Sequence, residues 1–286
     1  MKIDGSVAII TGGASGMGKA LAEKLVSQGG KVLIADRDTT KGPAVADDLN
    51  ERFGAGKAIF HETDLTKWKT LEAAFEKTKT EFGKINIVVN NAGIVETSSW
   101  INDNDPREDM CDYLVLNVDL TAVAKGSRLA IQYFANNRDV GEGVVISTSS
   151  LYGLFNSGIV PLYAAAKAGV VSLVKSHAMQ KEFTNTRHVA ICPWFVDTPL
   201  LEEHFRGALA YNKVELIQPE RVVEAFVMAI ENDDLNGAIL KVFPDQTSVQ
   251  EEVLSTEDLT LAKHVRVMEQ FILKRQDEAR LNETKP

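Results

Sequence analysis

Tyr163 and Lys167 are the pair of residues whose types and spacing most directly suggest chemistry in this chain. Three alanines separate them, and in a helix that spacing places a phenol and an ammonium group on one face. A nearby cation favours the phenolate, so we expect Lys167 to lower the pKa of Tyr163 from about 10 toward working pH. The same spacing also arises by chance on ordinary helix surfaces, so its meaning depends on the rest of the chain.

Two further polar residues could assist such a phenol. Ser150 stands thirteen residues before Tyr163, just after an apolar run at 144–146. A hydroxyl at the carboxyl end of a strand can donate a hydrogen bond to a substrate oxygen, although serines there also form turns. Asn117 is polar within an apolar helical pattern. For a lone asparagine, a solvated face or a satisfied core amide would be the commoner meaning.

A glycine-rich turn near the N-terminus separates an apolar run at 7–10 from a helical pattern. Few β-carbons obstruct such a turn, and the free N–H groups of the following helix carry partial positive charge, so the turn can hold a diphosphate. The spacing is G-x-x-x-G-x-G rather than the general G-x-G-x-x-G. We expect dinucleotide binding by Gly12, Ser15, Gly16, Met17 and Gly18.

Asp36 ends the second predicted strand, eighteen residues after Gly18. An acidic residue at this place can accept hydrogen bonds from an adenosine ribose and repels a 2′-phosphate, which favours NAD over NADP. The alternative is a solvated loop acid. Arg37 beside it could attract a phosphate, but Ser15 adds no second basic group.

These residues need elements to position them, and short β-rich runs alternate with helical patterns through most of the chain. Such alternation predicts an α/β fold: one Rossmann-like, doubly wound domain with a parallel sheet of about seven strands and helices on both faces. The predicted strands are 6–11, 31–35, 57–61, 85–89, 142–147, 187–191 and 237–243. The predicted helices are 17–28, 40–53, 67–82, 108–137, 161–183 and 219–232.

Two segments fall outside the alternation. Residues 195–218 form a long connection rich in bulky groups, typical of a lid over a site. Apolar residues recur at spacings of three and four within 255–282, which predicts a helix. We therefore expect a catalytic domain over 1–250 and a helical C-terminal extension over 251–286.

Composition excludes several classes of function. The 286 residues are 44% hydrophobic and 25% charged, as in ordinary globular proteins. A net charge of -9 without a cluster of Lys and Arg argues against nucleic-acid binding. Two cysteines supply neither a disulfide framework nor a metal cluster, so we expect no metal. We find no signal-peptide pattern and no apolar stretch of bilayer length, and expect a cytoplasmic protein that binds no membrane.

A set of motifs in this chain, in combination and in order, resembles the short-chain dehydrogenase/reductase family over residues 3–245. The set consists of the glycine turn, the strand-end acids, the Asn90–Gly93 motif, Asn117, Ser150, Tyr163 and Lys167. The resemblance implies that Tyr163 is the general acid and base, and that Lys167 holds ribose hydroxyls and lowers the tyrosine pKa. It also implies that Ser150 orients the substrate oxygen and that Asn117 positions a water in a proton relay. It implies that Thr198 binds the nicotinamide carboxamide. Further cofactor-binding residues are expected at Asp64, Leu65, Asn91, Ala92, Gly93, Pro193 and Val196.

Three segments of the chain most resemble one NAD-dependent branch of the family: Met1–Gly18, Ala190–Pro193 and 231–239. The chain departs from the usual pattern at three positions: Trp194 replaces a glycine, Val160 a glutamine of that branch, and Asn86 an aspartate. The bulky groups predict a fairly large apolar secondary alcohol or ketone as the substrate. Its expected contacts are Ser150, Leu151, Phe155, Val160, Tyr163, Trp194 and Phe195.

The resemblance also implies a homodimer or homotetramer, assembled through the helices predicted at 108–137 and 161–183. Two alternative functions remain. One is a biosynthetic ketoreductase that uses NADPH. The other is a dinucleotide-binding scaffold that has lost catalysis, with Trp194 blocking the site and the tail binding a partner.

Overall fold

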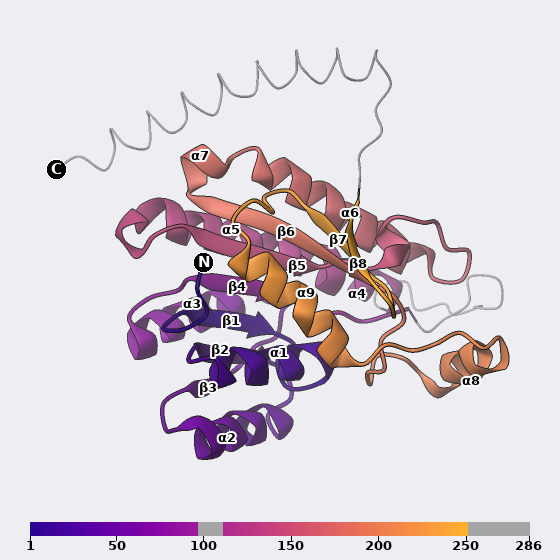
Figure 1. Ribbon diagram of the computed structural model, residues 1–286, viewed down its shortest axis with the longest axis horizontal. Helices are drawn as coiled ribbons and strands as arrows, with labels where there is room; N and C mark the ends of the chain where they lie inside the picture. Colours follow the sequence, from indigo (N-terminus) through magenta and orange to yellow (C-terminus); the bar gives the residue numbers. More distant parts are fainter. Residues whose placement is uncertain (97–110, 251–286) are drawn as a thin grey trace, which may run out of the picture.

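The computed structural model describes residues 1–96 and 111–250, which form a single sheet with helices on both faces (Figure 1). The strand order is β3-β2-β1-β4-β5-β6-β7-β8. All neighbouring strands are parallel except β7 and β8, which are antiparallel. The strands are β1 (Val7–Thr11), β2 (Lys31–Asp36), β3 (Ala58–Glu62), β4 (Ile87–Asn90), β5 (Gly143–Thr148), β6 (Thr186–Pro193), β7 (Ile239–Val242) and β8 (Thr247–Val249).

The predicted doubly wound fold is confirmed, and all seven predicted strands are present. Strand β8 was not predicted, because three residues after a turn carry too short a pattern to be recognised. The helices and helical turns are α1 (Gly16–Ser27), α2 (Lys41–Phe53), α3 (Trp68–Phe82), α4 (Cys111–Leu116), η1 (Asn117–Thr121), α5 (Ala122–Asn136), η2 (Arg138–Val140), η3 (Leu151–Gly153), α6 (Pro161–Ala178), α7 (Lys181–Thr184), α8 (Glu203–Tyr211) and α9 (Pro219–Glu231).

The central strands are buried on both faces, so adjacent residues such as Ile9 and Ile10 belong to different hydrophobic clusters. Helices α1, α2 and α9 cover the face that includes Ile10. Helices α3 and α5 cover the face that includes Ile9, and α6 packs on the same side over β6. Figure 1 shows α1 and α9 side by side in front of the sheet. Because the strand order reverses between β1 and β4, a crevice is expected at the carboxyl ends there.

The single helix predicted over 108–137 is interrupted. Its described part consists of α4, a π-helical turn η1 and α5. A π-helical turn adds a residue to the turn and changes which side chains face the protein interior, so apolar periodicity does not reveal it. Here Asp119 is fully buried, whereas Asn117 is exposed.

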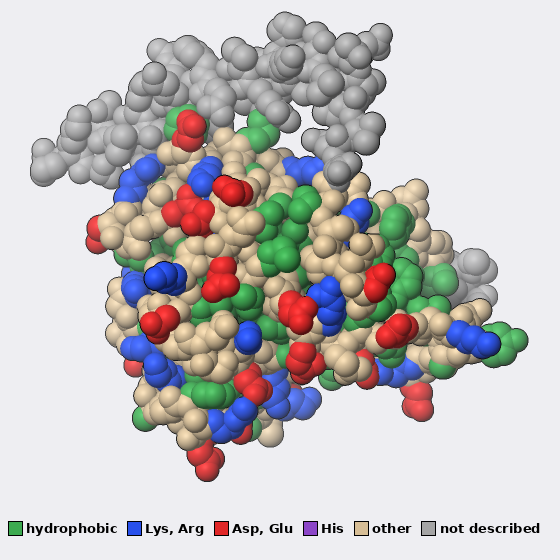
Figure 2. Space-filling view, in the orientation of Figure 1, with side chains coloured by type: hydrophobic (Ala, Val, Ile, Leu, Met, Phe, Trp, Pro, Cys, Tyr) green, Lys and Arg blue, Asp and Glu red, His purple; other side chains and the backbone are tan. Residues whose placement is uncertain are grey.

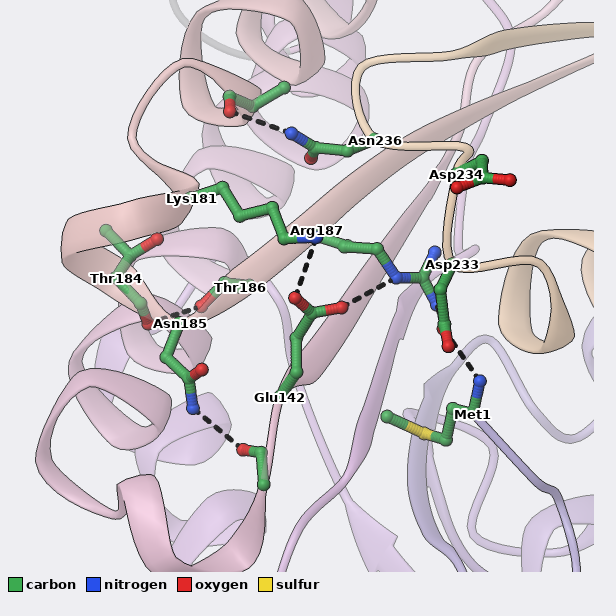
Figure 3. A network of polar contacts seen from close by, with 12 residues as sticks. Met1, Glu142, Lys181, Thr184, Asn185, Thr186, Arg187, Asp233, Asp234 and Asn236 are labelled. Carbon is green, nitrogen blue, oxygen red and sulfur yellow. Dashed lines mark hydrogen bonds and ion pairs between the residues drawn. The ribbon is translucent and has the colours of Figure 1, made fainter.

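A buried arginine joins three parts of the chain at the amino end of β6 (Figure 3). Nε of Arg187 donates to Oε2 of Glu142 at 3.0 Å, and its terminal nitrogens donate to two backbone carbonyls of α9 at 3.0 Å each. Asp233 lies 3.2 Å from Nη2 and also pairs with the ammonium group of Met1 at 2.7 Å. The network therefore ties the N-terminus and the end of α9 to the amino end of β6, whereas the crevice lies at the carboxyl ends of the strands.

The predicted lid 195–218 contains α8, which lies beyond the carboxyl ends of the strands in Figure 1. Val196 forms a parallel bridge with Ile217, so the segment leaves and returns at one place. Arg206 of α8 donates to the backbone oxygen of Thr198 at 2.6 Å and forms an ion pair with Asp197. These contacts fix the start of the lid against α8. The helix predicted over 255–282 lies outside the described residues.

Basic and acidic side chains are mixed over the face shown in Figure 2, with no broad field of one sign among the residues described there. Within residues 1–96 and 111–250, no helix has the length and apolar character needed to cross a membrane.

Candidate active site

A cavity of about 860 Å³ lies at the carboxyl ends of the strands. It runs from the glycine turn after β1, past Asp36 and Asp64, to Ser150 and Tyr163 and then to the lid. Every predicted cofactor-binding and substrate-binding residue except Gly18 lines it. The tertiary structure therefore brings together segments from most of the sequence, as the parallel topology requires.

The glycine turn has a shape that side chains would destroy. Gly12 and Gly16 have φ angles of +66° and +50°, in the left-handed region. A Cβ on Gly12 would lie 2.8 Å from Cα of Ala92, and one on Gly18 would lie 2.2 Å from the carbonyl oxygen of Gly12. Gly18 thus packs against the backbone of the turn and does not line the cavity. This cradle, open at the start of α1, fits the diphosphate of a dinucleotide.

Asp36 faces the same turn from the end of β2. Its Oδ2 accepts the N–H of Ala14 at 3.0 Å, and its Oδ1 accepts the N–H of Asp38 at 3.0 Å. The carboxylate therefore helps to hold the turn in addition to lining the cavity. Further along, the Thr66 hydroxyl and Lys67 hold the pKa of Asp64 down to about 2.

Asn91 ties three strands together behind the cavity. Its Nδ2 donates to the backbone oxygen of Thr11 at 3.1 Å, and its Oδ1 accepts the Thr148 hydroxyl at 3.5 Å. The Thr11 hydroxyl in turn accepts the N–H of Asn91 at 2.9 Å. These bonds fix the carboxyl ends of β1, β4 and β5 relative to one another.

Tyr163 and Lys167 lie on α6 with Nζ of Lys167 5.3 Å from the centre of the phenol ring. The side chain of Ser150 acts to lower the pKa of Tyr163, and both residues line the cavity. Pro161 begins the helix, where its missing N–H is no loss. The buried carboxylate of Glu96 accepts the N–H of Tyr163 at 2.7 Å, so it caps the helix at the residue that carries the phenol.

The buried cation has two oxygen partners. Nζ of Lys167 donates to the carbonyl of Thr148 at 3.0 Å and pairs with Oδ2 of Asp119 at 3.0 Å. Lys167 and Asp119 are 2% and 0% exposed, so each charge depends on the other for compensation. Although burial opposes the charge, Asp119 and Tyr163 raise the pKa of Lys167.

The predicted downward shift of the Tyr163 pKa is wrong in direction. Burial raises the pKa of Tyr163 above its ordinary value. Lys167 acts to lower this pKa, as expected, and so does Ser150, but Asp119 acts against them. The correction arises because burial and a carboxylate were both invisible in the local spacing.

The structure does not bring Asn117 to this cluster. Its side chain is exposed on η1 and does not line the cavity. Asp119, two residues later, is instead the polar residue of this segment that lies beside Lys167. Sequence reasoning missed Asp119 and Glu96, and the only signal for either was an acidic residue beside a motif.

The far end of the cavity is apolar. Val160 is buried, and the Trp194 indole N–H donates to the carbonyl of Glu215 at 3.0 Å, which fixes the ring against the lid. Tyr152, which the sequence did not single out, packs edge-on against two aromatic rings. Its ring centre lies 6.4 Å from that of Tyr163 and 6.1 Å from that of Phe195. Additional apolar lining residues are Ile94, Val95, Leu114, Val118, Leu151, Phe155, Ile159, Leu200, Leu201 and Phe205.

Comparisons with known proteins agree with this geometry. A family model described as short chain dehydrogenase matches residues 6–208. The chain is 33% identical over 257 residues to a Bos taurus 15-hydroxyprostaglandin dehydrogenase whose name specifies NAD(+), with 85% of this chain and 92% of the relative covered. This is the branch that three segments of the sequence resemble.

Two solved structures share the fold and differ in the cofactor that they use or contain. One is a 3-ketoacyl-(acyl-carrier-protein) reductase from Brucella melitensis complexed with NADH, with a TM-score of 0.73, 29% identity, and 85% of this chain and 98% of that chain covered. The other is an NADPH-dependent 3-quinuclidinone reductase from Rhodotorula rubra, with a TM-score of 0.74, 25% identity, and 85% and 91% covered. The chain belongs to the short-chain dehydrogenase family, oxidoreductases that act on CH–OH donors or the corresponding carbonyl groups.

Proposed function

We propose that this protein oxidises a fairly large, apolar secondary alcohol with NAD, or reduces the corresponding ketone with NADH. The observation that carries the proposal is one cavity lined both by the glycine cradle and by Ser150, Tyr163 and Lys167, with Nζ of Lys167 5.3 Å from the centre of the Tyr163 ring. A binding site for a dinucleotide and a group able to move a proton are therefore adjacent. The apolar far end supports a substrate larger than a simple alcohol.

Each residue has a distinct task in this proposal. Bound NAD supplies the hydride acceptor. The phenolate oxygen of Tyr163 takes the proton of the substrate hydroxyl during oxidation and returns it to the carbonyl oxygen during reduction. Ser150 donates a hydrogen bond to the same substrate oxygen and orients it. Lys167 stabilises the phenolate by its positive charge.

NAD is favoured over NADP because Asp36 stands where the adenosine ribose would lie. A carboxylate there accepts hydrogen bonds from ribose hydroxyls and repels a 2′-phosphate. One observation favours the NADPH-dependent alternative: Arg37 also lines the cavity. Initial rates with NAD, NADP, NADH and NADPH decide between them. A preference for the phosphorylated cofactors would refute the role assigned to Asp36.

Replacing Tyr163 with phenylalanine tests the chemistry. Tyr163→Phe is expected to reduce turnover by orders of magnitude while NAD still binds. Tyr211→Phe is the matched control, because this tyrosine is 87% exposed on α8 and does not line the cavity. Turnover by Tyr163→Phe close to that of the control would remove Tyr163 from the mechanism.

A screen of NAD reduction across secondary alcohols of increasing apolar bulk tests the substrate class. Rates should rise with bulk if the far end of the cavity binds the substrate. Cofactor binding without turnover across alcohols and ketones would instead indicate a non-catalytic dinucleotide-binding scaffold.

We also propose a homodimer or homotetramer that uses α5 and α6, as the family resemblance implies. Light scattering at micromolar concentration measures this directly. A purely monomeric protein would contradict the assembly while leaving the chemistry untouched.

A further inference from the structure

Asp119 forms a buried ion pair that the proposed chemistry does not require. Its Oδ2 lies 3.0 Å from Nζ of Lys167, and its Oδ1 accepts the N–H of Ile94 at 2.8 Å. Both carboxylate oxygens are therefore held in place. A Cβ on Gly93 would lie 2.9 Å from Oδ2 of Asp119 and 3.3 Å from Nζ of Lys167, so a glycine there leaves room for the pair.

The pair changes what Lys167 can do for the phenol. A bare ammonium group 5.3 Å from the ring would strongly favour the phenolate. An ammonium group held against a carboxylate presents a dipole instead, and in a buried site with little screening the opposing charge still acts on the phenol. The positive field at Tyr163 is consequently reduced by Asp119.

Other groups around Tyr163 do not restore that field. From the loop after β4, Glu96 adds a second carboxylate, which accepts the backbone N–H of Tyr163. From β6, Cys192 faces the site. Burial raises the pKa of its thiol to about 11, so the thiol is neutral at neutral pH. From η3, Tyr152 presents an uncharged ring, and Ser150 presents a hydroxyl. Among the described groups that act on the phenol, Lys167 is thus the cation, and the carboxylate of Asp119 paired with it acts against it.

We propose that Asp119 is a positioning residue that makes Tyr163 a weaker acid through its ion pair with Lys167, and so moves the onset of alcohol oxidation to higher pH. This inference rests on the proposed function for its effect on turnover, but the acidity of the phenol can be measured without substrate or cofactor. The upward shift of the Tyr163 pKa, to which Asp119 contributes, agrees with it.

The test is a titration of Tyr163 in the ligand-free protein. The chain has five tyrosines. Labelling them with ¹³C at Cζ gives one NMR signal for each, and the signal missing from Tyr163→Phe identifies Tyr163. Asp119→Asn keeps the shape of the side chain and an oxygen for the Ile94 N–H, but removes the charge. Asp139→Asn is the matched control, because Asp139 is exposed on η2, away from the cavity.

In Asp119→Asn, Tyr163 is expected to titrate about one pH unit or more below its value in the unaltered protein. Asp139→Asn should leave it unchanged. An unchanged titration in Asp119→Asn, an equal shift in both variants, or no titration of Tyr163 in either protein before unfolding would each overturn the proposal. If Asp119→Asn does not fold, Asp119→Ser replaces it, and failure of both to fold would show a purely structural role and also overturn it.

Activity provides the second readout. If the protein oxidises alcohols through Tyr163, the alkaline rise of kcat in Asp119→Asn should move to lower pH by the same amount as the titration. An absence of turnover in the unaltered protein would refute only the proposed function, because the NMR titration still decides the role of Asp119.

Discussion

His188 makes the stability of this protein sensitive to acid in a way that can be calculated. The residue lies on β6 with 0% exposure, and neither of its ring nitrogens has a hydrogen-bond partner among the described residues. Its ring centre is 4.9 Å from that of His177. Burial, with a smaller contribution from His177, lowers the pKa of His188 from 6.5 to about 3. The folded protein therefore keeps this imidazole neutral across most of the acidic range.

The sign follows from proton binding in the two states. The unfolded chain protonates this histidine below pH 6.5, whereas the folded protein does not until about pH 3. The contribution to stability is thus intact above pH 6.5 and is lost as the pH falls between these two values. At pH 5, 1.5 units below the unfolded pKa, the loss is about 2 kcal/mol at about 1.4 kcal/mol for each unit.

Urea unfolding of the unaltered protein and of His188→Leu at pH 7.5 and pH 5 measures this term. The variant has an aliphatic side chain of similar size and does not titrate, so its free energy of unfolding should fall by about 2 kcal/mol less between the two pH values. His61→Leu is the comparison variant: burial lowers the pKa of His61 too, but this residue is only partly buried and its Nδ1 has a partner in Thr63, so its removal should change the acid sensitivity by less than His188→Leu. Equal acid sensitivity of His188→Leu and the unaltered protein would refute the reasoning.

Three further predictions concern single side chains. Asp36→Ala should reduce the ratio of kcat/KM for NAD to that for NADP by about tenfold or more, because the charge that repels a 2′-phosphate is lost; an unchanged ratio would contradict this. Cys192, whose pKa is raised to about 11 by burial, should resist iodoacetamide at pH 8 in the folded protein and react after unfolding, as followed by the mass of its peptide. Glu142→Ala removes the acceptor of the buried Arg187 Nε and should lower the free energy of unfolding by about 2 kcal/mol in urea titrations; a loss below about 0.5 kcal/mol would show that the remaining partners of Arg187 suffice.

The sequence by itself determined the order of strands and helices and most of the cavity lining. The glycine turn could be recognised because its backbone shape and close approaches exclude side chains, as the short distances around Gly12 and Gly18 show. Tyr163 and Lys167 could be paired because i and i+4 positions share a helix face wherever the helix lies. These are local properties, so a single sequence carries them.

Only the tertiary structure decided which charges meet. The π-helical turn η1 leaves Asn117 exposed and buries Asp119, and nothing in the local pattern distinguishes these two residues. The pairing of Asp119 with Lys167 joins segments nearly fifty residues apart, and the upward shift of the Tyr163 pKa arises mainly from burial, with a contribution from Asp119. Electrostatic effects depend on the distances between groups and on their exclusion from water, and both quantities exist only once the chain is packed.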